Sequence, residues 1–292
     1  PSDTDAKATQ VGLYLQDQVE IGALMLTAGA RYDFARTTID DNIGGARSSI
    51  SDQALTGRFG ALYRFDNGVA PYASVATSFE PVTTAPASGE ANFDPSEGLQ
   101  FEAGVKWADP AGRFMLTASA FQIVQTNVIT YDATWTPVQT GEIETWGVEL
   151  EARAQLTDAL AVIGSYSFID QEVTATDTAS ALGKMPARVP SHQASVWAKY
   201  AFDAGVDVGG GLRYVGESWG DAANSFKVGD VLLVDASIGY DLGKLSPDLA
   251  GARVQVNATN LFDEDYTASC ASLYACFAGS GRAVKATLSY AW

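Results

Sequence analysis

Hydrophobic and polar residues alternate with a period of two along almost the whole chain, a pattern that predicts β-strands. In residues 24–34 every second position is Leu, Ala, Tyr or Phe, and 55–65, 99–107 and 146–156 repeat the pattern. With the similar runs elsewhere, the chain is predicted to form about thirteen strands and no helix. The further runs lie near 11–20, 69–80, 113–128, 160–169, 193–202, 206–215, 231–242, 252–262 and 283–292.

The predicted connections between strands alternate between short turns and long polar loops. The short turns are rich in Asp and Gly, which favour turns, and lie at 20–22, 66–68, 108–112, 157–159 and 203–205. The long loops are expected near 35–53, 81–96, 129–144, 170–191, 216–230 and 263–282. Short turns on one rim and long loops on the other are typical of outer-membrane β-barrels. A soluble β-sandwich is not expected to place its short turns at one end and its long loops at the other.

The two faces of the predicted strands differ in charge. In the four clearest strands the apolar column holds no charged residue, and a Lys or Arg facing lipid costs about 2–4 kcal/mol at the bilayer midplane. A soluble sandwich also has one apolar face, but strict exclusion of charge favours a membrane. The opposite column contains Arg31, Arg58, Arg64, Glu102, Lys106, Glu149, Glu151 and Arg153.

Aromatic residues gather at the ends of the apolar columns. This placement resembles the aromatic girdles at the two membrane interfaces, although the general β-propensity of aromatic residues is an alternative explanation. Together with the sorting of the loops, it favours a transmembrane antiparallel β-barrel. The residues are Tyr32, Phe34, Tyr63, Phe65, Trp107, Trp146, Tyr200, Phe202 and Tyr240.

Composition removes several functional classes. The 292 residues carry a formal net charge of −17, which argues against nucleic acid as a partner. No run approaches the roughly 20 apolar residues of a membrane helix. The only histidine, His192, and a single pair of cysteines give poor support for a metal site or a catalytic centre. The chain begins at Pro1, so we interpret it as mature or truncated, with one barrel domain over residues 1–292.

The final residues, "AVKATLSYAW", form an alternating strand that ends in the apolar column with Tyr290 and Trp292. A terminal aromatic residue that closes such a strand resembles the assembly signal of bacterial outer-membrane barrels. The expected partners are therefore the barrel-assembly machinery and the surrounding lipid and lipopolysaccharide.

Several stretches, in the same order, resemble the barrel of TonB-dependent siderophore receptors of the ferrichrome-receptor type. They include "FDNGVAPYASVATSFEP" (65–81), "GLRYVGESWGDAANSFKVGDVLLVDA" (211–236) and "NLFDEDYTASCASLYACF" (260–277). The resemblance implies a barrel of about 22 strands around an N-terminal plug that contacts TonB. This chain has only about thirteen strands and no plug. We expect the C-terminal part of such a barrel, which does not close on its own because its first and last strands run in the same direction.

The function implied by the resemblance is TonB-dependent import of a ferric siderophore, hydroxamate and ferrichrome-like, with no enzymatic step and no cofactor. The alternative is a passive porin-like channel. The resemblance also implies an aromatic residue beside the first cysteine, where this chain has Ala271, so the siderophore class stays open. Cys270 and Cys276 are expected to form a disulfide in an oxidising compartment. The candidate ligand contacts are the loop aromatics Phe79, Tyr131, Trp135, Trp219, Phe226, Tyr274 and Phe277.

Overall fold

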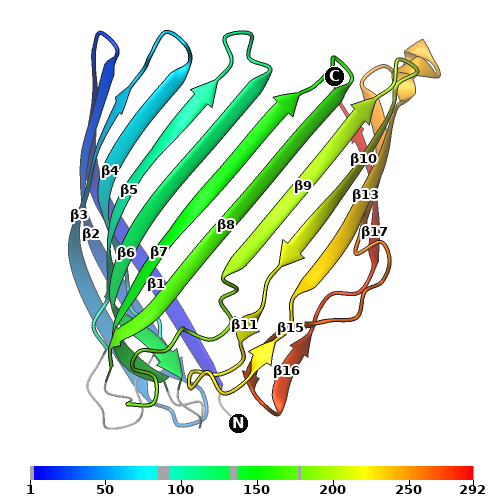
Figure 1. Cartoon of the computed structure of the whole chain (residues 1–292). Coiled ribbons are helices and arrows are strands. Elements are labelled where there is room, and N and C mark those ends of the chain that lie inside the picture. The colour runs from blue at the N-terminus through cyan, green and yellow to red at the C-terminus, as the bar shows by residue number, and fades with distance from the viewer. Residues whose placement is uncertain (1–2, 85–92, 132–136, 177–178, 292) are drawn as a thin grey trace.

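A computed structural model describes residues 3–84, 93–131, 137–176 and 179–291. Its main element is one antiparallel sheet of 13 strands, in the order β1 to β10, β13, β14 and β17 (Figure 1). The strands are β1 (Thr4–Ile21), β2 (Leu24–Asp41), β3 (Arg47–Tyr63), β4 (Val69–Glu80), β5 (Ser96–Ala108), β6 (Phe114–Tyr131), β7 (Pro137–Gln155), β8 (Leu160–Ala175), β9 (His192–Ala201), β10 (Val206–Val215), β13 (Val231–Asp241), β14 (Ala252–Thr259) and β17 (Ala283–Tyr290).

The sheet is open, and this confirms the prediction of a partial antiparallel barrel. It curves into a trough whose two edges are β1 and β17, and the described residues of these strands do not pair with each other. In Figure 1 the N-terminus lies at the rim of the long loops and the C-terminus at the rim of the short turns. Both edge strands therefore run toward the short-turn rim, and direct closure would join them in parallel.

The prediction of a loop at 35–53 is wrong. Strand β2 continues to Asp41 and β3 begins at Arg47, so only residues 42–46 lie between them. The hairpin projects beyond the aromatic pair Tyr32–Phe34, and there the polarity of its two faces is exchanged. The column with Ala35 is buried, while the opposite column is polar. A polar outward face looks like a loop in the sequence, although the strand continues.

Other connections also differ from the sequence-based boundaries. Strand β6 extends to Tyr131 and β7 begins at Pro137, so most of the loop expected at 129–144 is strand. The turn between β13 and β14 is long for the short-turn rim and contains two 3-10 helices, η1 (Leu242–Lys244) and η2 (Pro247–Leu249), that the alternation did not predict. In the described part of the chain, no helix is long and apolar enough to cross a membrane.

The cross-strand register keeps the two columns separate over the whole sheet. Leu55, Phe59 and Leu150 belong to the apolar column and are 71%, 51% and 46% exposed. The polar column lies on the concave side, because its side chains meet across an intervening strand. Arg253 on β14 donates to Asp207 on β10, over Gly239 of β13. Such contacts require converging side chains, so the apolar column covers the outer wall.

Candidate functional site

The concave wall is a network of polar contacts built over glycines. Arg58 on β3 donates to Gln16 on β1 above Gly29, which pairs with both residues. Asp207, whose side chain is 6% exposed, also has the Lys199 ammonium at 3.6 Å. A Cβ atom at Gly239 would collide with Arg253 and Asp207, so close approach requires glycine there, whereas Gly29 has room for a Cβ atom at ordinary contact distances.

The "GGG" stretch at 209–211 has the same role. Gly209 and Gly211 face the concave side and lie against the indole of Trp197 on β9, so that a Cβ atom at either would collide with the ring. The wall is therefore shaped by alternating glycines and large side chains.

The mouth of the trough, at the long-loop rim, contains a small hydrophobic cluster. Ile39, Ile50 and Val82 are at most 5% exposed, and Phe93 and Ile129 pack against them. Val82 follows β4, and its backbone amide donates to the Asp52 carboxylate at 3.4 Å. These contacts fix the start of the β4–β5 connection against the inner side of the β2–β3 hairpin.

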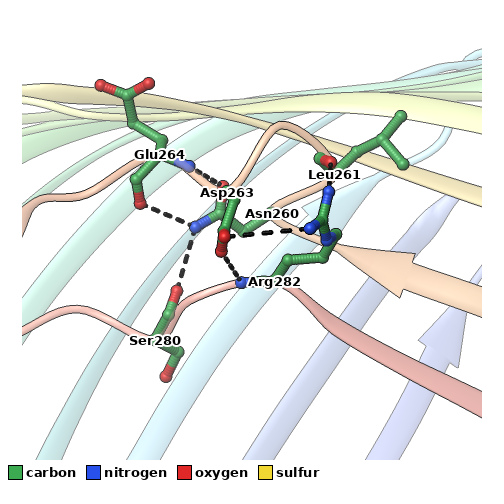
Figure 2. A network of polar contacts seen from close by, with 6 residues as sticks. All are labelled: Asn260, Leu261, Asp263, Glu264, Ser280 and Arg282. Carbon is green, nitrogen blue, oxygen red and sulfur yellow. Dashed lines mark hydrogen bonds and ion pairs between the residues drawn. The ribbon is translucent and has the colours of Figure 1, made fainter.

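The base of the last long loop is closed by a polar network (Figure 2). Asn260, 3% exposed, donates through its amide to the carbonyl oxygens of Glu264 and Ser280, at 2.9 and 3.1 Å, and accepts from the Glu264 amide at 2.8 Å. The Asp263 carboxylate accepts from the Arg282 amide at 2.7 Å, and the Arg282 guanidinium donates to the Leu261 carbonyl. The two ends of the loop are thereby held together.

This network is anchored to the barrel wall. The backbone N–H of Asn260 donates to the Asp235 carboxylate of β13 at 2.9 Å, and Arg213 of β10 forms an ion pair with the same carboxylate. Asn260 and Asp263 adopt φ values of +49° and +58°, a left-handed conformation that Asn and Asp tolerate better than most residues. The "NLFD" segment therefore turns sharply where strand β14 becomes loop.

Beyond this base, the last loop forms a hairpin of β15 (Thr267–Ser272) and β16 (Ala275–Ala278). Cys270 pairs with Cys276 across the hairpin, and the two residues form a disulfide. Cys270 is 2% exposed, whereas Tyr274 in the connecting turn is 95% exposed. The hairpin is therefore a covalently closed element with an exposed aromatic tip.

The preceding loop forms a second hairpin, of β11 (Ser218–Trp219) and β12 (Lys227–Val228), and β12 lies against β15. The Lys227 ammonium is 5.2 Å from the centre of the Trp219 ring and 2.7 Å from the Glu217 carboxylate. Phe226 is half-buried, and its ring covers Gly220. Two of the candidate aromatics are thus held by neighbours within their own loop.

The seven candidate aromatics separate into groups. Trp219 and Phe226, together with Tyr274 and Phe277, lie on the two adjacent hairpins at the mouth, and Phe277 is 55% exposed. Phe79 is half-buried near the end of β4 and belongs to the outward column of Val75, away from this group. Tyr131 is the last residue of β6 and its side chain is not described, while Trp135 lies outside the described residues.

Residues that the sequence analysis missed connect the loops. Asn224 and Met185 form two hydrogen bonds, from the Met185 amide to Oδ1 at 3.0 Å and from Nδ2 to the Met185 carbonyl at 2.8 Å. Arg188 donates through its backbone amide to the Trp219 carbonyl at 2.8 Å, and through Nε to the Cys270 carbonyl at 2.9 Å. An Asn in a polar loop is only a weak indication of a contact between loops, and no sequence pattern predicts the role of Arg188.

The outer wall carries aromatic residues near both rims. Tyr32 packs edge-on against Phe34 toward the long loops, and Tyr63 and Tyr200 make the same contact with Phe65 and Phe202 near the short turns. Near the long-loop rim, Trp146, Phe168 and His192 form a further aromatic group. Tyr290 ends β17 in the outward column and is 59% exposed, and Trp292 lies outside the described residues.

An open sheet with an apolar outer wall, a polar inner wall and long loops on one rim defines part of a receptor-type outer-membrane β-barrel. The chain belongs to the TonB dependent receptor-like, beta-barrel family, whose model matches residues 1–261. This confirms the family resemblance found in the sequence. Homologues of this family are outer-membrane β-barrel proteins and are transporters or receptors rather than enzymes.

Two curated relatives are similar over almost the whole chain. The chain is 41% identical over 290 residues to the "Ferrichrome outer membrane transporter/phage receptor" of Escherichia coli strain K12, covering 97% of this chain and 38% of the relative. It is 36% identical over 291 residues to the "Ferrioxamine B receptor" of Salmonella typhimurium strain SL1344, covering 98% and 41%. The chain therefore spans less than half the length of these relatives.

Solved structures give the same fold. The siderophore receptor PiuA from Acinetobacter baumannii superposes with a TM-score of 0.81 at 25% identity, over 99% of this chain and 44% of that protein. The ferric citrate transporter FecA in its unliganded form superposes with a TM-score of 0.78 at 21% identity, over 99% and 46%. The second comparison supports the fold alone.

Proposed function

We propose that this chain is the C-terminal part of an outer-membrane receptor that imports a ferric siderophore by TonB-dependent active transport. The siderophore class that we favour is a hydroxamate, ferrichrome-like chelate, because the similar curated relatives are named for ferrichrome and ferrioxamine. The structural observation that carries the proposal is the group of aromatic side chains on two adjacent hairpins at the mouth of a polar trough.

In this proposal the long loops face the outside of the cell, and the short turns and the C-terminus face the periplasm. Trp219, Phe226, Tyr274 and Phe277 contact the chelate, and TonB acts through a plug encoded elsewhere in the complete receptor. The apolar outer wall contacts lipid and lipopolysaccharide. The end of β17, with Tyr290, is recognised by the barrel-assembly machinery. The protein needs no cofactor, and the ferric chelate is cargo.

The test is growth of a siderophore-receptor deletion strain that carries the complete gene containing this segment. Iron would be supplied as ferrichrome, ferrioxamine B or a ferric catecholate, in cells with and without TonB. We expect growth on a hydroxamate chelate only in cells with TonB. Growth that is independent of TonB would favour the passive channel, and no growth on any ferric chelate would refute siderophore import.

A further inference from the structure

The three long loops nearest the C-terminus meet at one residue, Arg188. Its backbone amide binds the Trp219 carbonyl of the 216–230 loop, and its guanidinium binds the Cys270 carbonyl of the disulfide hairpin. Arg188 itself belongs to the 176–191 loop. Hydrogen bonds to carbonyl oxygens fix backbone positions, so these contacts set how the loops lie relative to one another.

A second contact supports the same arrangement. The double hydrogen bond between Asn224 and Met185 joins the 216–230 loop to the 176–191 loop at a point separate from Arg188. Two separate connections resist rotation of one loop about the other, which a single hydrogen bond does not. Arg188 then extends the pair to the third loop.

The third loop gives this group a fixed base. Its hairpin is closed by the Cys270–Cys276 disulfide, and its ends are held by the Asn260 network of Figure 2, which is bonded to Asp235 of the barrel wall. A continuous path of hydrogen bonds and loop backbone, stiffened by the disulfide, therefore leads from the wall to Trp219. The exposed hairpin tip and Trp219 belong to one connected unit.

We propose that Arg188 is a positioning residue that locks these three loops into one preformed unit, so that the disulfide hairpin sets the place of Trp219. The effect on ligand affinity rests on the proposed function, because Trp219 is a candidate siderophore contact only there. A preformed site binds more tightly because less loop entropy is lost on binding. The mechanical connection among the loops does not depend on what the ligand is.

The backbone of Arg188 allows a selective test. Its φ of +70° lies in the left-handed region, which glycine adopts without strain. Arg188→Gly therefore removes the guanidinium but keeps the conformation and the amide that binds Trp219. Arg188→Lys keeps a cationic donor within reach of the Cys270 carbonyl. Lys184→Ala is the matched control, because it removes a cation from the same loop, while the described hydrogen bonds of Lys184, with Ala181 and Val173, are made by its backbone and remain possible.

Hydrogen–deuterium exchange of the complete receptor in lipid nanodiscs, without ligand, is the primary measurement. In Arg188→Gly we expect exchange in peptides from 216–230 and 267–278 to rise about tenfold, with β9 and β10 unchanged as the folding control. Arg188→Lys restores part of the protection, and Lys184→Ala changes neither segment. Unchanged exchange in 216–230 in Arg188→Gly would overturn the proposal.

A double-mutant cycle tests the link to the disulfide. Replacing Cys270 and Cys276 by Ser is expected to raise exchange in 216–230 when Arg188 is present and to add nothing in the Arg188→Gly background. Equal increases in both backgrounds would contradict the coupling. If Arg188→Gly fails to assemble, the Ser pair and Arg188→Lys carry the test.

Ligand binding then separates this proposal from the proposed function. For ferric hydroxamate siderophores, Arg188→Gly is expected to raise Kd about tenfold, or about 1.4 kcal/mol, while the maximal transport rate stays the same. A wild-type receptor that binds no ferric siderophore would refute the proposed function, and the exchange result would still decide the role of Arg188.

Discussion

The outward direction of the apolar column can be tested by placing a charge at its centre. Leu150 lies on β7, four residues from Trp146 at one end of the apolar band and four from Ala154, which pairs with Phe114 at the other end. At about 3.3 Å per residue, those eight steps cover roughly 26 Å along the strand. With a strand tilt of about 40°, this corresponds to roughly 20 Å of bilayer, so Leu150 lies near the midplane.

We therefore expect Leu150→Lys to lower the free energy of unfolding from the membrane by about 2–4 kcal/mol. The matched control is Thr117→Lys on β6. Thr117 is on the opposite column and pairs with Glu151 on one side and Lys106 on the other, so the same new charge faces the polar side with one carboxylate and one ammonium beside it. This control is expected to change stability by less than about 1 kcal/mol, because the attraction of the new ammonium to Glu151 offsets its repulsion from Lys106 on the polar side.

The assay is guanidinium unfolding of the complete receptor in phospholipid vesicles, followed by tryptophan fluorescence. Correct assembly of both variants is checked beforehand by their heat-sensitive migration on gels. If the two lysine variants are equally stable, the apolar column does not face lipid, and the assignment of inner and outer walls is wrong.

Three further predictions concern single positions. In the β2–β3 turn, the Asp41 carboxylate accepts hydrogen bonds from the backbone amides of Gly44 and Ile43, which lower its pKa from 3.8. The stabilisation is therefore complete above pH 3.8 and is lost as the pH falls through the lower pKa of the folded state. In Asp41→Ala, hydrogen exchange of residues 42–46, corrected for intrinsic rates, should no longer show this acid-sensitive step. Gly239→Val would force a Cβ to within 2.8 Å of the Asp207 carboxylate oxygens and should cost about 1–3 kcal/mol in guanidinium unfolding, whereas Gly210→Val, whose nearest atom is 3.8 Å away, should not. Asn260→Ala removes a buried side chain that makes three hydrogen bonds and should cost about 1–3 kcal/mol in total, seen as faster exchange in residues 260–282, and unchanged exchange would refute the role of the network.

Much of the barrel can be predicted from the sequence because its strands obey one rule. In the membrane, backbone groups pair along the sheet and side chains alternate between lipid and lumen, so period and charge together indicate strand, face and order. Residues 99–107 and 206–215 lie in β5 and β10 as expected. The rule fails where the strand leaves the bilayer. Beyond Phe34 the outer face meets water and the inner face packs on other loops, so the polarity is exchanged and β2 continues through a segment that looks like a loop.

The candidate site is less predictable for a different reason. Aromatic loop residues can be picked out by type, and four of the seven do lie on two adjacent hairpins, but type alone did not separate Phe79 from them. The contacts that organise the mouth are made to backbone carbonyls, at Met185, Trp219 and Cys270. Every residue has a carbonyl, so neither partner of such a bond stands out in the sequence.

The difference between side-chain contacts in the wall and backbone contacts among the loops explains how the loop tips can vary while the wall stays the same. In the wall, a substitution such as one at Gly239 meets side chains from two other strands, so the strands constrain each other's sequence. At the mouth, Arg188 binds main-chain atoms whose positions depend little on the side chains of their residues. Tyr274 and its neighbours at the hairpin tip can therefore change without loss of the connected frame. Specificity for one chelate over another is expected to change at such exposed tips, while affinity depends on the buried contacts that hold the tips in place.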